Sequence, residues 1–138
     1  MSLFGALPIA GSGIDAMQTW IDTTGGNLAN IDDVAPTGSA TYAAQTPILS
    51  AVDPGIPGAV APGQGVAVSA IELGSTAGVV ESDPQSPLAD AQGDVRVPDI
   101  SMSDQLVTLI EAQQGYQADT DVISQAKSAY QAGLTIGS

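Results

Sequence analysis

The sequence contains no cysteine and no histidine, and its only basic residues are Arg96 and Lys127. It therefore has no thiol nucleophile, no Ser-His-Asp triad and no ordinary zinc site. Two basic residues against 15 acidic ones give a net charge of −13, so the cationic surface that nucleic-acid binding requires is missing. We expect no catalytic residue, no metal ion, no cofactor, no small-molecule substrate and no nucleic-acid partner.

Long apolar runs are also missing, because 16 glycines and nine prolines interrupt the 138 residues. No segment is long and apolar enough to predict a membrane span. The apolar start at residues 3–10 has no Lys or Arg near it, since the first basic residue is Arg96. A cleaved secretory signal needs a basic region at that point. If the chain leaves the cytoplasm, we expect it to use a route that reads no such signal.

The pattern of residues divides the chain into three parts. Residues 1–33 and 99–138 are predicted to be helical, and residues 34–98 hold all but one of the prolines. Short β-branched runs in the middle part predict strands at 66–73, 79–80 and 95–97, with a weaker candidate at 41–49 that contains Pro47. The sequence thus predicts an α+β fold, with N- and C-terminal helices pairing as a coiled coil around a small, irregular β-rich segment.

The first part carries a regular apolar pattern. Apolar residues recur at alternating steps of four and three, which is the pattern of a heptad seam. Because proline disrupts a helix interior, we expect the main helix to begin near Pro8. Gly11, Ser12 and Gly13 are then interpreted as its entry, with Ser12 as a helix cap and not a nucleophile. The N-terminal seam consists of Leu3, Leu7, Ala10, Ile14, Met17, Ile21, Thr24, Leu28 and Ile31.

The last part repeats this rhythm less purely. The C-terminal seam consists of Met102, Leu106, Leu109, Tyr116, Ile123, Tyr130 and Leu134, with polar residues at Gln113, Thr120 and Lys127. A neighbouring stripe of small residues would let another helix approach closely: Ala118, Val122, Ala126, Ala129 and Gly133. The two seams can pair with each other or with those of neighbouring copies. Either arrangement is typical of a subunit that polymerises through its ends.

Aspartates in the middle part are the remaining candidates for chemistry. Asp83, Asp90 and Asp94 lie in a Pro/Gly-rich stretch, and paired carboxylates serve in glycoside hydrolysis. Few aromatic residues are available to hold a sugar, and the spacing differs from that of a calcium-binding loop. We expect a solvated turn here.

Two motifs resemble the bacterial flagellar rod and hook protein family. The first is Ser12-Gly13-Ile14-Asp15-Ala16, followed by Asn27-Leu28-Ala29-Asn30. The second is the stretch 106–119, which ends in Tyr116-Gln117-Ala118-Asp119. In that stretch Gln114 and Asp119 stand where the family has Arg and Asn. The segments 65–68, 83–90 and 93–98 are similar to the proximal-rod member of the family.

This resemblance implies a structural role. It implies a subunit of the proximal rod, which assembles with copies of itself and other rod proteins into the drive shaft of the flagellum. Rod-base and export-gate components would be further partners. Export would run through the flagellar type III apparatus, without a cleaved signal, to the basal body. Asn27 and Asn30 would be hydrogen-bonding residues that end the first helix.

Two alternatives remain open at this point. One is another axial protein of the flagellum, such as the companion rod subunit. The other is a secreted acidic module that binds cations or carbohydrate.

Overall fold

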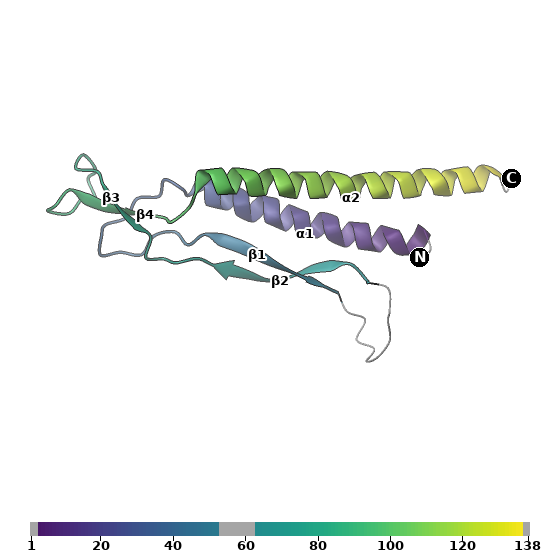
Figure 1. The fold of residues 1–138 in the computed structure, drawn as a ribbon, viewed down its shortest axis with the longest axis horizontal. Helices are drawn as coiled ribbons and strands as arrows, with labels where there is room; N and C mark the ends of the chain where they lie inside the picture. Colours follow the sequence, from purple (N-terminus) through teal and green to yellow (C-terminus); the bar gives the residue numbers. More distant parts are fainter. Residues whose placement is uncertain (1–2, 53–62, 137–138) are drawn as a thin grey trace.

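The computed structural model describes residues 3–52 and 63–136 and has an α+β fold. Along the chain, one long helix comes first, four short strands follow, and a second long helix comes last (Figure 1). The division of the chain into parts at residues 1–33, 34–98 and 99–138 remains a prediction. The elements are α1 (Leu3–Ala29), β1 (Gln45–Ala51), β2 (Val66–Leu73), β3 (Val79–Ser82), β4 (Asp94–Val97) and α2 (Met102–Ile136).

The two helices run antiparallel and pack side by side, as Figure 1 shows. α1 has 27 residues and α2 has 35, which corresponds to lengths of about 40 and 52 Å. The C-terminal end of α2 therefore extends past the start of α1. Strands β1 and β2 pack against α1, whereas among the described elements α2 contacts α1 alone. α1 is thus the central element of the molecule.

Strands β1 and β2 form an antiparallel pair that includes a proline. Pro47 is buried opposite Ile71, and the register shifts between Ile48 and Leu49. In a two-stranded sheet each strand has one free edge, and a proline is tolerated there because no ladder hydrogen bond is lost. The weak strand candidate at 41–49 is therefore real, although the strand itself runs from Gln45 to Ala51.

Strands β3 and β4 form a second antiparallel pair beyond the end where α1 stops and α2 begins (Figure 1). Ala35 and Arg96 exchange backbone hydrogen bonds of 2.8 Å in each direction, which ties the segment after α1 to β4. Val95 is 1% exposed, and among the described residues it has the largest fully buried side chain. The strands predicted at 66–73, 79–80 and 95–97 are confirmed.

The prediction that the first helix begins near Pro8 is wrong, because α1 starts at Leu3 and contains Pro8. The interpretation of residues 11–13 as the helix entry is wrong for the same reason. Pro8 lies only in the second turn and on the exposed side of α1. It removes one backbone hydrogen bond there, and its ring does not interfere with packing. The contacts of α1 with α2 and with the strands β1 and β2 therefore outweigh the unfavourable effect of Pro8 on the helix.

The helix core is built from small side chains. Ala10 and Ala16 of α1 and Ala112 and Ala126 of α2 are all at most 5% exposed. Alanine contributes little apolar area, so dispersion contacts between closely spaced helices must supply much of the stability. This arrangement makes the helix pair sensitive to any added side-chain volume.

Candidate assembly interface

Two glycines lie in the contact between the helices. Gly13 of α1 lies directly against the Asp119 side chain of α2, where a Cβ would overlap the carboxyl group. A Cβ on Gly115 would lie 2.8 Å from the Met17 Sδ atom. The N-terminal and C-terminal sequence motifs therefore meet in space, at Gly13 and Asp119.

Replacing Gly13 by leucine should destabilise the helix pair, because the new side chain has no room beside Asp119. We expect the free energy of unfolding to fall by about 1–3 kcal/mol, as for other overpacked cores. Gly25→Leu is the matched control, since nothing lies within 4 Å of a Cβ at that position of the same helix. The control should be neutral or stabilising, because leucine favours a helix over glycine. Urea unfolding of both variants measures this, and equal stability would contradict the packing described.

The N-terminal seam lies along α1 as a band of half-buried residues. Among the large side chains, Leu7, Ile14, Met17, Ile21 and Leu28 are all half-buried, as is Ile31 just after the helix. Asp15, Gln18 and Asp22, which fall off the seam, are exposed. The side chain of Leu3 lies outside the described residues.

Part of the C-terminal seam contacts α1, and part of it is exposed to solvent. Leu109, Tyr116 and Ile123 are half-buried, whereas Met102, Leu106, Tyr130 and Leu134 are 46–57% exposed. A seam of period 3.5 drifts by about 20° per heptad on a straight helix of period 3.6. The drift leaves Met102 and Leu106 outside the contact with α1. Tyr130 and Leu134 are exposed because they lie in the last eight residues of α2, the length by which it exceeds α1.

Most of the small-residue stripe predicted on the last helix does not face α1. Ala126 is buried, but Ala118, Val122, Ala129 and Gly133 are exposed. The small residues that face α1 are instead Ala112, Gly115 and Ala126. They lie one helix position away from the apolar seam, on the side of α2 that contacts α1.

The two seams meet at the surface of the helix pair. A shallow hollow of about 200 Å³ is lined by Gln18, Ile21 and Asp22 of α1 and by Tyr116 of α2. Ile21 and Tyr116 are half-buried there, so each keeps apolar surface exposed to a potential neighbour. This hollow is the part of the structure that best fits a contact between subunits.

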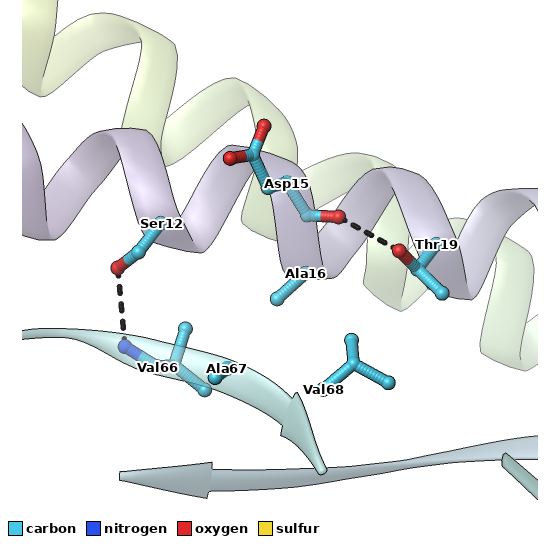
Figure 2. Close-up of a pocket in the computed structure, with 7 residues that line it drawn as sticks. All are labelled: Ser12, Asp15, Ala16, Thr19, Val66, Ala67 and Val68. Carbon is cyan, nitrogen blue, oxygen red and sulfur yellow. Dashed lines mark hydrogen bonds between the residues drawn. The ribbon is translucent and has the colours of Figure 1, made fainter. Parts of the chain in front are cut away.

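The other side of α1 faces strand β2, as Figure 2 shows. Ser12 Oγ donates to Ile9 O at 2.7 Å and accepts a hydrogen bond from Val66 N at 3.1 Å. Ser12 therefore lies inside α1 and is not a cap, which corrects the interpretation from the sequence. Its hydroxyl joins the helix to the beginning of β2. A second hollow beside it is lined by Ser12, Asp15, Ala16, Thr19 and residues 66–68.

Asn27 forms the most connected junction in the described structure. Its side chain is 2% exposed, and its Nδ2 donates to Gln45 O and to Gln105 Oε1, both at 2.9 Å. Its Oδ1 accepts from Gln45 N at 2.8 Å and from Tyr42 OH at 3.2 Å. One side chain therefore joins the end of α1 to β1 and to the start of α2.

The two motif asparagines have different roles. Asn30 Nδ2 donates to Gly26 O at 2.8 Å, so it ends the helix as predicted. Asn27 does not, because all four of its side-chain hydrogen bonds go to other segments. Sequence reasoning missed Tyr42, Gln45 and Gln105, since only the fold brings them together. Of the other motif residues, Leu28 is half-buried, and Ala29 and Ala118 are exposed.

The aspartates of the middle part organise a turn. Asp90 Oδ1 accepts hydrogen bonds from Gln92 N at 2.9 Å and Asp94 N at 3.0 Å, and its Oδ2 accepts one from Thr37 Oγ1 at 3.0 Å. In the described residues, no three acidic side chains gather in a way that could hold a metal ion. The geometry favours the solvated turn over a cation site.

Asp90 should make stability depend on pH in the acid range. The backbone N–H groups of Asp94 and Gln92 donate hydrogen bonds to its carboxylate and lower the pKa of this group below its ordinary value. A lowered folded-state pKa adds stability above the unfolded-state value, and that stability is lost as the pH falls through the folded-state value. Asp90→Asn should therefore lower the urea midpoint at pH 7 but not below the folded-state pKa. Asp15→Asn, at an exposed position, is the control; a pH-independent effect of Asp90→Asn would contradict this account.

No helix within residues 3–52 and 63–136 combines the length and the apolar character that crossing a bilayer requires.

Comparison with known proteins gives consistent matches. Residues 91–136 match the family described as "Flagellar basal body rod FlgEFG protein C-terminal". The chain is 32% identical to a protein of Yersinia enterocolitica named "Flagellar basal-body rod protein FlgC", with 99% of each chain aligned. Proteins of the same name from Salmonella typhimurium and Borreliella burgdorferi are 31% and 28% identical, and cover 99% of this chain.

Proposed function

The chain belongs to the family of flagellar basal-body rod proteins named FlgC, and we propose that it is a structural subunit of the rod in the bacterial flagellar basal body. The observation that carries this proposal is the extent of the similarity. The relative from Yersinia enterocolitica aligns with 99% of this chain and over 99% of its own length. The match therefore includes both helices and the β-rich middle.

Within the basal body we assign the chain to the proximal rod, where it assembles with copies of itself and with other rod proteins. Rod-base and export-gate components are its further partners. The chain reaches this place through the flagellar type III apparatus, largely unfolded and without cleavage of a signal. The name shared by the relatives favours this subunit over the companion rod protein.

The helix pair is the part that we propose to form the inner, coiled-coil layer of the rod. Ile21 and Tyr116 support this, because they lie together at the surface and are only half-buried. Neighbouring subunits would cover the rest of both seams. The role is mechanical and not enzymatic: the chain has no histidine or cysteine, and the family is named for a rod protein.

Deletion of the gene in the bacterium that encodes the chain tests this function. The mutant should not swim and should lack hooks and rods by electron microscopy, and a plasmid copy should restore both. A deletion strain that swims normally would contradict the proposal.

A further inference from the structure

The start of α2 carries an apolar patch that no other described element covers. Met102, Leu106, Val107 and Ile110 are 53, 46, 56 and 53% exposed. Their spacing of four, one and three residues places them on one side of the helix. That side points away from α1, because the residues that face α1 here are Leu109 and Ala112. Among the described elements α2 contacts α1 alone, so the patch is open.

Four exposed carboxylates lie at the same end of the molecule. The hydrogen bond of 2.9 Å between Asn27 and Gln105 holds the end of α1 next to the start of α2. Asp32 and Asp33 follow α1 within four residues, and Asp99 and Asp104 lie within three residues of the first residue of α2. All four are exposed.

The two basic residues do not neutralise this end. Lys127 lies 17 residues beyond Ile110 on α2, which is about 26 Å along a helix. Arg96 lies near this end, because it pairs with Ala35 just after α1, but its single positive charge does not balance four carboxylates. We call the four apolar residues and the four carboxylates the acidic–apolar patch.

We propose that the acidic–apolar patch binds a basic amphipathic helix of another protein. The inference rests on the proposed function, and it adds the chemistry of the neighbour that this face receives. Side chains at i, i+4 and i+8 of one helix form a ridge against which a second helix packs. Lysine or arginine beside the apolar stripe of the partner would complement Asp32, Asp33, Asp99 and Asp104.

A second copy of this chain is a poor occupant of the patch. Each copy carries a net charge of −13, and contact between copies here would bring carboxylates close to a surface of the same sign. Charges closer than the Debye length, about 8 Å at physiological ionic strength, are only partly screened from each other. The charge therefore favours contact with a different, basic protein at this face.

Binding of designed peptides to the full-length chain tests the proposal. The probe is a helical peptide of about 18 residues with leucine at heptad positions a and d and lysine at e and g. One comparison peptide has glutamate for lysine, and another has glutamine for leucine. Fluorescence anisotropy measures Kd at low and high salt. We expect the leucine–lysine peptide to bind at least tenfold more tightly than either comparison peptide, and less tightly as salt rises.

Matched variants locate the binding surface. Leu106→Gln should weaken binding about tenfold, whereas Val122→Gln, at a similarly exposed position of α2, should leave Kd within about twofold. Asp33→Asn with Asp99→Asn should also weaken binding, whereas Asp15→Asn with Asp121→Asn removes equal charge elsewhere and should not. Circular dichroism confirms that each variant keeps its helices.

Three results would overturn the inference: equal binding of the glutamate peptide, equal binding of the peptide without leucine, or control variants as weak as the patch variants. Self-association of the chain in sedimentation, abolished by Leu106→Gln, would assign the patch to a second copy and also overturn it. The proposed function is judged separately, by whether the wild-type chain is present in purified basal bodies. If the chain is present in basal bodies but its patch variants bind the peptide normally, the proposed function stands and the inference about the patch fails.

Discussion

A strain whose only copy of the chain carries Ile21→Asp should fail to swim, although the variant is still exported. Ile21 is half-buried in the hollow that it shares with Tyr116. Burying an isoleucine fully stabilises a contact by roughly 1.5–3 kcal/mol, and an unpaired buried carboxylate adds a further desolvation penalty. In a helical polymer that penalty recurs in every copy. During export of an unfolded chain the residue is already in water, so the substitution has little effect at that stage.

Swimming on soft agar and blots of the exported fraction measure the two parts of this prediction. Gln125→Asp is the control, because it adds the same charge at an exposed position of α2 that lies outside the hollow and outside both seams. The control should swim normally. If Ile21→Asp also swims, the hollow is not buried in the assembled rod and the interface must lie elsewhere.

Asn27→Leu should be the most destabilising single substitution in the helix–strand junction. It removes the partner of Gln45 N, Gln45 O, Gln105 Oε1 and Tyr42 OH together. Leaving buried polar groups without partners costs about 1–3 kcal/mol each. Even if water reaches some of them, the free energy of unfolding should fall by about 3 kcal/mol or more. Urea unfolding measures the loss.

Asn30→Leu is the matched control for this prediction, since its side chain makes one hydrogen bond, to Gly26 O in its own helix. Its loss should be about 1 kcal/mol. Equal effects at the two positions would mean that Asn27 does not hold α1, β1 and α2 together.

Local patterns in the sequence predicted most of the fold. The heptad rhythm located both helices, a mostly period-two pattern located β2, and β-branched pairs located β3 and β4. The start of α1 was missed because the rule about Pro8 is local, whereas the helix is stabilised by packing against α2 and β2. In such a case the packing against other elements outweighs the low helix propensity of proline.

The contacts within the interface were harder to predict. Periodicity places a residue on a face but does not say which partner approaches it. Gly13 against Asp119, and Asn27 against Gln45 and Gln105, depend on the relative register of segments far apart in the chain. The drift between periods 3.5 and 3.6 further separated the true contact line of α2 from its apolar seam. The motif residues were thus identified, while their partners were not.

Crosslinking in purified basal bodies tests the central claim most directly. The natural sequence has no cysteine, so Ile21→Cys with Tyr116→Cys creates the only thiols in the chain. A short bismaleimide should link them, and Ile21→Cys alone serves as the control. The account predicts that the chain is present in the rod and that most copies are linked internally, with the mass of one chain. Absence from the basal body, or links between different copies only, would contradict a rod subunit built on an α1–α2 pair.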